Sequence, residues 1–262
     1  MEMILNNPIG YIDTFLLIFV RMMGVMMMLP IFSNRNVPQM TKIGLSIFTS
    51  MIVLSTSSLQ APVSSENVIG YALAVILEFI VGYTIGFSAY MVFSILSLAG
   101  QFIDMQIGFS MVNVFDPMSQ IQLTITGNVY YYILMMITLV TNAHHHFLRA
   151  FLESFTYVPL GGMVISPGLN DALIGFMTDY FMMALRIATP IFFVMLITNV
   201  ILGVLARAVP QLNLFVIGFP IKILFGLSTI FVVLTVFSRV SDELISESQK
   251  QMLRMIEGMR PE

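Results

Sequence analysis

Long apolar runs, separated by short polar breaks, dominate the chain. The runs fall at about 11–32, 44–59, 68–98, 129–141, 172–205 and 214–237. Several exceed the roughly 20 residues that a helix needs to cross the hydrocarbon layer of a membrane. Because lipid offers no hydrogen bonds to the backbone, runs of this length predict helices rather than the alternating strands of a barrel. We therefore expect an all-α, multi-helix integral membrane protein.

The breaks between the runs contain turn-forming residues. Asparagine and proline lie in 33–38, proline and asparagine in 60–67, and three glycines with two prolines in 159–170. These breaks are short connections, and none is long enough to separate domains. We therefore expect a single membrane domain over residues 1–262, ending in a short amphipathic cytoplasmic tail at about 240–262.

The tail differs in pattern from the rest of the chain. Its apolar residues fall near one helical face, among acidic and basic residues. They are Val240, Leu244, Ile245, Met252, Met255, Ile256 and Met259. This pattern predicts a short amphipathic helix that rests on the membrane or on a neighbouring element.

Charge placement constrains how many runs cross the membrane. The first run is preceded by Glu2 and no basic residue, whereas Arg35, Lys42 and the basic residues of the tail favour the cytoplasmic side. An amino end outside and a tail inside require an odd number of crossings. Six apolar runs would give an even number, so we expect at least one run not to be a simple span.

Composition supports a membrane protein and excludes several functions. Hydrophobic residues make up 58% of the chain and charged residues 10%, against roughly 45–50% and 25% in soluble domains. The 11 basic residues are dispersed and the net charge is -3, so the chain lacks the cationic footprint of a nucleic-acid binder. Nucleic acid is therefore not an expected partner.

Catalytic and metal-binding patterns are also missing from the sequence. The chain has no cysteine, no Gly-rich phosphate loop and no spacing that suggests a Ser/His/Asp triad. His144, His145 and His146 are consecutive, so on a helix they diverge by about 100° each and do not converge on one ion. We interpret them as a polar helix end, and we expect no catalytic residue, no metal and no cofactor.

Residues 99–117, here called the polar stretch, need a special explanation. The polar stretch lies between apolar runs yet contains two carboxylates, several amides, two glycines and a proline. Broken backbone at membrane depth persists only where protein or water surrounds it. The stretch is either a re-entrant or pore-lining loop, or an ordinary loop outside the membrane whose Phe and Met residues pack onto helices. Asp104 favours the first, because an ionisable group beside apolar segments usually faces a partner charge or a wet cavity.

Several other charges fall within or beside apolar runs. Arg186 and Lys222 are possible partners of Asp104, although Lys222 could equally snorkel to a membrane interface. Each lies near a helix-breaking proline, Arg186 four residues before Pro190 and Lys222 two residues after Pro220. We therefore expect broken or kinked helices at these places.

Glu78 lies in the third run, and two glycines follow it at helical spacing. Gly82 and Gly86 favour close helix packing. For Glu78 we favour an interhelical hydrogen bond or an interface position over proton transfer. Asp116 and Arg207 complete the set of buried-charge or packing candidates.

Strings of residues in three sections of the chain carry a resemblance that runs essentially end to end. Arg21 with Leu-Pro-Ile-Phe-Ser at 29–33 is followed by Ala-Gly-Gln-Phe-Ile at 99–103, Gln-Ile-Gly-Phe at 106–109 and Asp-Pro at 116–117. The most specific string is Leu-Ala-Arg-Ala-Val-Pro-Gln-Leu-Asn at 205–213, which runs into Phe-Val-Ile-Gly-Phe-Pro at 215–220. The chain resembles the FliR family of flagellar export-gate proteins, which also includes the SctT subunit of virulence injectisomes.

The resemblance implies an architectural role rather than an enzyme. It implies a subunit that forms, with FliP and FliQ, a helical gate in the bacterial inner membrane at the flagellar basal body, with FlhB and FlhA nearby. The gate would conduct unfolded flagellar proteins, and lipid would contact its outer surface. The family's central loop, by match residues 106–122, would narrow or plug the conduit. Candidate constriction residues are Gln106, Phe109, Met111, Val114 and Phe115.

Two alternatives remain open at this point. The chain could be a secondary transporter that binds a small solute with Glu78, Asp104, Arg186 and Lys222 around broken helices. No corresponding pair of broken segments is evident in its two halves, which weakens this alternative. The chain could also be the equivalent subunit of a virulence injectisome, although the central and late strings favour the flagellum.

Overall fold

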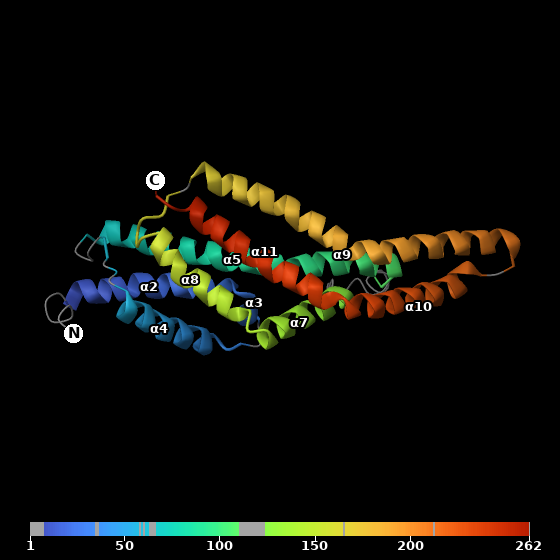
Figure 1. The fold of residues 1–262 in the computed structure, drawn as a ribbon, viewed down its shortest axis with the longest axis horizontal. Helices are drawn as coiled ribbons and strands as arrows, with labels where there is room; N and C mark the ends of the chain where they lie inside the picture. The colour runs from blue at the N-terminus through green and yellow to red at the C-terminus, as the bar shows by residue number, and fades with distance from the viewer. Residues whose placement is uncertain are drawn as a thin grey trace. The chain divides into compact units, whose positions relative to one another are not determined.

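The computed structural model describes residues 8–34, 37–57, 59, 61–62, 67–109, 124–164, 166–211 and 213–261. Within these ranges every regular element is an α-helix, as Figure 1 shows. The helices are α2 (Pro8–Met28), α3 (Pro30–Ser33), α4 (Gln39–Thr56), α5 (Val68–Ile107), α7 (Ile125–Val140), α8 (His144–Tyr157), α9 (Pro167–Ala208), α10 (Leu214–Thr235) and α11 (Phe237–Gly258). The all-α prediction is confirmed.

Four of the described helices are long and apolar enough to cross a membrane. They are α2 over Ile9–Met28, α5 over Val68–Ile107, α9 over Gly168–Ala208 and α10 over Val216–Thr235. The runs at 44–59 and 129–141 fold as α4 and α7, which do not meet these criteria. Length and composition alone do not fix which helices cross, so the odd number of crossings and the orientation of the chain stay predictions.

The chain divides into two compact units. Unit 1 comprises Met1–Val92, Asn142–Met177 and Ile245–Glu262, and unit 2 comprises Phe93–Thr141 and Thr178–Leu244. The long helices α5 and α9 and the last helix α11 each contribute residues to both units. A single domain over residues 1–262 stays a prediction.

In unit 1, α2 and α5 pack with their backbones in contact. A Cβ atom added to Gly82 of α5 would lie 2.0 Å from the Arg21 carbonyl oxygen, and one added to Gly86 would lie 2.7 Å from the Val25 carbonyl oxygen. From the other side, a Cβ on Gly24 of α2 would lie 2.8 Å from the Phe79 carbonyl oxygen. Only glycine allows so close an approach, so the predicted packing role of Gly82 and Gly86 is confirmed.

The first turn of the chain is set by Pro30. The residue before a proline is driven toward an extended conformation, and Leu29 has φ -59 and ψ 127. This ends α2 at Met28, and Pro30 then starts the short helix α3. After the break α4 returns beside α2 (Figure 1). Its buried Ser46 and Ser50 hydroxyls donate to backbone carbonyls one turn earlier, at 2.8 and 2.5 Å, which satisfies them within the helix.

The predicted amphipathic tail is α11, and its apolar face packs within the chain itself. Met252, Met255 and Ile256 are buried in unit 1. Beyond them, the amide of Val164 donates to the Met259 carbonyl oxygen at 3.2 Å, and the Ser166 hydroxyl donates to the Gly258 carbonyl oxygen at 2.7 Å. This part of α11 rests on unit 1 of the same chain, and the cytoplasmic position of the tail stays a prediction.

One helix of unit 1 was not predicted. Helix α8 begins at His144, so the three histidines do lie at a polar helix end. Its buried side chains are Phe147, Ala150, Phe151, Ser154 and Phe155. They recur at helical spacing, but charged residues interrupt them, so a search for continuous apolar runs does not detect this helix.

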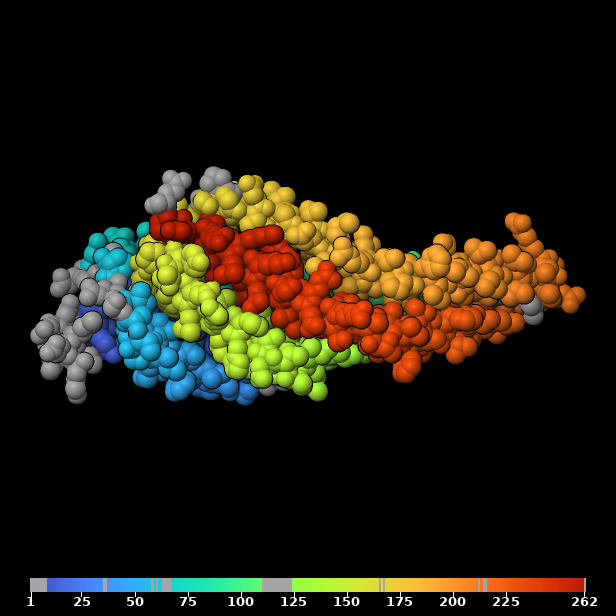
Figure 2. Space-filling view, viewed as in Figure 1, coloured from blue at the N-terminus to red at the C-terminus, as the bar shows by residue number. Residues whose placement is uncertain are grey.

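In unit 2, α9 and α10 form a helical hairpin with largely apolar outer faces. Both helices continue through their internal prolines, Pro190 and Pro220. Gly218 of α10 faces Leu202 of α9, and Figure 2 shows the two arms against each other. Large apolar side chains remain exposed on both arms, including Phe193 of α9 and Phe231 of α10, which is 72% exposed.

Candidate functional site

A buried ion pair joins α2 and α5 in unit 1. The Arg21 guanidinium contacts the Glu78 carboxylate through two bonds, Nε to Oε2 at 2.5 Å and Nη2 to Oε1 at 3.0 Å. Both side chains are 1% exposed. A bidentate arrangement of this kind suits the planar fork of arginine. The Glu78 carboxylate therefore bonds to a neighbouring helix.

Two further segments of unit 1 complete the surroundings of this pair. The Arg21 Nη1 atom donates to the Ser154 carbonyl oxygen of α8 at 3.2 Å, and the guanidinium lies 4.4 Å from the centre of the Phe155 ring. The amide of Gly161, in the connection after α8, donates to Glu78 Oε1 at 2.7 Å. Because both charges are satisfied by protein groups, we interpret the cluster as a structural brace that holds four segments together.

Sequence reasoning did not find the partner of Glu78. Arg21 entered only through the resemblance, although a cation within an apolar run itself signals a counter-charge. The two residues are 57 positions apart, and a single sequence carries no signal that pairs them over that separation.

The polar stretch begins as helix, which corrects one prediction. Residues 99–107 were expected to belong to a broken or re-entrant loop, but they form the end of α5. Ile103 and Ile107 are buried, whereas Gln101 and Gln106 are exposed. This is the periodicity of an amphipathic helix end, so the polar residues do not require a break. The helix ends at Ile107. Gly108 follows with a φ of +101, and Phe109 is half-buried.

Asp104 is buried, and its partner lies in α7. The Thr126 hydroxyl donates to Asp104 Oδ1 at 2.5 Å, and the Thr126 amide lies 3.3 Å from both carboxylate oxygens. The two candidate cations are therefore not its partners, since Arg186 pairs instead with Glu243 at 3.0 Å. A hydroxyl and an amide at a helix N-terminus stabilise the carboxylate without a counter-ion.

The other candidates are placed as follows. Lys222 is half-buried and Arg207 is exposed, and neither makes an ion pair with the residues that the structure describes. Arg186 is 72% exposed. Met111, Val114, Phe115 and Asp116 lie outside the described residues. Within the described ranges, no group of three His, Asp or Glu residues could hold a metal ion.

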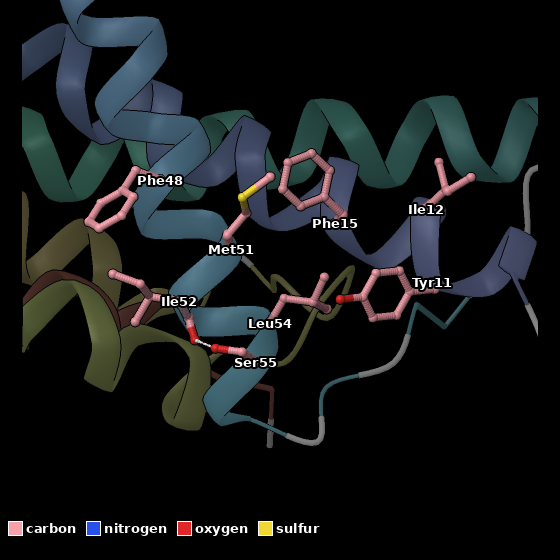
Figure 3. A pocket seen from close by; sticks show the side chains of 8 residues that line it. All are labelled: Tyr11, Ile12, Phe15, Phe48, Met51, Ile52, Leu54 and Ser55. Carbon is pink, nitrogen blue, oxygen red and sulfur yellow. Dashed lines mark hydrogen bonds between the residues drawn. The ribbon is translucent and has the colours of Figure 1, made fainter. Parts of the chain in front are cut away.

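An apolar groove lies between α2 and α4 in unit 1 and is shown in Figure 3. Its volume is about 570 Å³, and its walls include Phe15 of α2 with Phe48 and Met51 of α4. Two residues of its lining carry a hydroxyl group, Tyr11 and Ser55. The Ser55 hydroxyl already donates to the Ile52 carbonyl oxygen at 2.9 Å. With no charged residue in its lining, the groove is an apolar contact surface rather than a reaction site.

Comparison with known proteins decides the family. A family model described as "Bacterial export proteins, family 1" matches residues 12–248. Flagellar biosynthetic protein FliR of Bacillus subtilis (strain 168) is 32% identical over 260 residues, which cover 96% of this chain and 99% of that protein. The chain belongs to the FliR family of bacterial export proteins. FliR of Escherichia coli (strain K12) is 28% identical over 228 residues, which cover 87% of this chain and 86% of that protein. FliR of Aquifex aeolicus (strain VF5) is 25% identical over 218 residues, which cover 83% of this chain and 83% of that protein.

Membership of the FliR family confirms the resemblance seen in the sequence. With four helices of membrane-spanning length, this FliR-family chain is a membrane-embedded export protein. The transporter alternative loses support, because Glu78 is bound by Arg21, Asp104 by Thr126 and Arg186 by Glu243.

Proposed function

We propose that this chain is a noncatalytic subunit of the flagellar type III protein-export gate. It forms, with FliP and FliQ, the conduit for unfolded flagellar proteins across the bacterial inner membrane at the flagellar basal body, beside FlhB and FlhA. The observation that carries this proposal is the near end-to-end match to flagellar biosynthetic protein FliR of Bacillus subtilis. The named relatives are flagellar proteins, which favours the flagellum over an injectisome.

The surface of unit 2 supports assembly with apolar partners. Exposed apolar side chains line both arms of the α9–α10 hairpin, among them Val200, Val204, Leu224 and Phe231. Apolar area on this scale must be covered by lipid or by other subunits. Neighbouring gate subunits would cover the part of the hairpin that lipid does not reach.

The buried charges support an architectural role. Arg21, Glu78 and Asp104 are satisfied by side-chain and backbone groups of the described residues. A catalytic acid or base needs access to a substrate proton. The polar atoms of these three side chains are instead hydrogen-bonded to other parts of the protein. We therefore assign them to holding the helices in place.

Coexpression with FliP and FliQ tests the proposed assembly. We expect an affinity-tagged chain, solubilised in mild detergent, to bring both partners with it through size-exclusion chromatography. A tagged, unrelated multi-helix membrane protein expressed with the same partners is the control and should bring neither. Deletion of the gene should abolish export of flagellar proteins to the medium, and a plasmid copy should restore it. Recovery of the chain as a solitary protein would contradict the proposal.

Residues 106–122, the central loop, are proposed to close the conduit when no substrate passes. Gln106 and Phe109 lie at its entry, where α5 ends, and Met111, Val114 and Phe115 are the proposed closing side chains. Flexible thioethers and aromatic rings can exclude water and ions yet deform around a passing unfolded chain.

Replacing residues 110–122 with glycine and serine residues of equal number should make the idle gate leak. The change begins after Phe109 because Ile107 is buried and its loss would disturb α5. We expect cells or vesicles that contain the assembled gate to become permeable to small solutes. The readout is solute efflux normalised to the amount of assembled gate, and vesicles without the gate give the baseline. Unchanged efflux would reject the closing role.

A further inference from the structure

Helices α5 and α7 run antiparallel in unit 2 and touch through two glycines. A Cβ added to Gly100 of α5 would lie 2.1 Å from the Gly127 amide nitrogen of α7, so the contact excludes any side chain at Gly100. Earlier in α5, the ring of Phe93 lies 6.0 Å from the ring of Tyr131, which comes later in α7. Residues earlier in one helix therefore meet residues later in the other, which fixes the antiparallel arrangement.

Two side-chain amides lie on the same side of this helix pair. Gln101 and Asn128 each follow a touching glycine by one residue, so each lies about 100° round its own helix from the contact. Because the helices are antiparallel, the two rotations lead to the same side of the pair. Both side chains are exposed. Four residues after each amide, Met105 is 66% exposed and Tyr132 is 53% exposed. We call these four residues the amide face.

Away from the amide face, other helices of unit 2 cover the pair. The ring of Phe102 in α5 lies 6.2 Å from the ring of Phe192 in α9. The ring of Tyr130 in α7 lies 5.0 Å from the ring of Phe237 in α11, and both of these residues are buried. These contacts join ring to ring. The pair therefore has a covered side built from aromatic contacts and an exposed side that carries amides.

The amide face is poorly suited to lipid. Helix α5 is long and apolar enough to span a membrane, and α7 is a shorter apolar helix. Neither the Gln101 nor the Asn128 side chain bonds to a residue that the structure describes. An amide without a hydrogen-bonding partner is costly in hydrocarbon, so the face needs water or another polypeptide against it. It carries no charge, and each amide both donates and accepts hydrogen bonds.

We infer that the amide face is part of the conduit wall and contacts the unfolded polypeptide in transit. This inference rests on the proposed function of the chain as a subunit of the export gate. An unfolded chain presents one peptide N–H and one C=O at almost every residue, whatever its side chains are. Uncharged amides can bond to either group and so replace lost water without selecting a sequence. The flexible thioether of Met105 adapts to passing side chains of different shape.

Photo-crosslinking in the assembled gate identifies what lies against the amide face. The photoreactive residue p-benzoylphenylalanine replaces Gln101, Asn128 or, as a control, Val232, which is 64% exposed on α10 and has an apolar side chain. The probe is an unfolded flagellar protein that ends in a stably folded domain, so that it stalls in the conduit. We expect crosslinks to the stalled protein from the first two positions and none from the control position.

Substitutions test whether the amides themselves matter to export. Gln101→Leu combined with Asn128→Leu removes both amide groups and leaves apolar side chains. We expect export per assembled gate to fall roughly fivefold, the effect of losing one neutral hydrogen bond, because passing peptide groups then lose water without replacement. Asn128→Gln keeps an amide at the same position and should match the parent. A face that contacts lipid would instead tolerate both leucines.

The outcomes distinguish this inference from the proposed function beneath it. Crosslinks from both amide positions to a gate subunit or to lipid, and not to the stalled protein, overturn the inference, and so does unchanged export by the double leucine variant. Copurification with FliP and FliQ would still support the proposed function in either case. If the chain neither copurifies with them nor is needed for export, the proposed function fails, and the inference fails with it.

A second crosslink covers the case in which the bulky photoreactive residue prevents assembly. The chain has no cysteine, so Gln101→Cys or Asn128→Cys provides one unique thiol. The stalled protein then carries a single cysteine in its unfolded part, and a mild oxidant is added to the assembled gate. A disulfide between the two chains supports the inference, and its absence at both positions overturns it.

Discussion

Substituting Arg21 with alanine is expected to destabilise the chain by about 3–5 kcal/mol, because it leaves a buried carboxylate without its counter-charge. Glu78 is 1% exposed and, among the described residues, would keep only the Gly161 amide as a hydrogen-bond partner. The Ser154 carbonyl oxygen would also lose the Arg21 donor and keep the Val158 amide. Since whole domains are stable by only about 5–15 kcal/mol, we expect reduced accumulation in membranes and a lower thermal unfolding temperature of the detergent-purified chain.

Removing both charges should be less harmful than removing one. Arg21→Met combined with Glu78→Leu replaces the pair with apolar side chains, a change that is often neutral at buried ion pairs. The control is Arg149→Ala in α8, which breaks an exposed pair with Glu153 whose side chains are 79% and 38% exposed. That loss should stay below about 1 kcal/mol. Equal effects of Arg21→Ala and Arg149→Ala would show that the buried pair is not a brace.

Gly82→Ala is expected to separate α2 from α5. The new Cβ would lie 2.0 Å from the Arg21 carbonyl oxygen and 2.8 Å from the Arg21 carbonyl carbon. These are backbone atoms, so the helices themselves must shift. Overpacking costs about 1–3 kcal/mol and occasionally more, and here the shift also displaces the residue that carries the buried guanidinium. The readout is again thermal unfolding of the purified chain.

Gly44→Ala in α4 provides the matched control for that experiment. A Cβ at Gly44 would meet nothing within 4 Å, and alanine is favoured over glycine within a helix by roughly 0.5–1 kcal/mol. We expect this variant to be neutral or slightly more stable. If the two alanine variants behaved alike, the close contact between α2 and α5 would not limit stability.

The helices were predictable wherever apolar residues run without interruption. Apolar runs do not predict the full length of a helix where polar side chains of that helix are exposed or hydrogen-bonded to other residues. Gln101 and Asp104 look like a helix break in the sequence, but Gln101 is exposed and Asp104 is bonded to Thr126, so α5 extends to Ile107. Helix α8 was missed for a related reason, because its apolar residues occupy only one face.

The candidate site was predictable by residue type and not by pairing. Glu78 was expected to make an interhelical bond, and the two glycines that follow it were expected to pack. The identity of its partner depends on how distant segments fold together, which a single sequence does not encode in any local pattern. The same is true of Asp104, for which nearby charges suggested Arg186 or Lys222 while the partner is a threonine at the start of α7.

The discontinuous make-up of unit 1 bears on how the chain matures. Its buried Met252, Met255 and Ile256 belong to the part of α11 that follows Leu244, and the ribosome makes this part only after all of unit 2. Nascent chains fold from the amino end as they emerge, so α2, α4 and α5 are made before the helix that completes their core exists. Unit 1 therefore remains unfinished throughout insertion, and a translation product truncated before α11 would present an open apolar face to quality-control proteases.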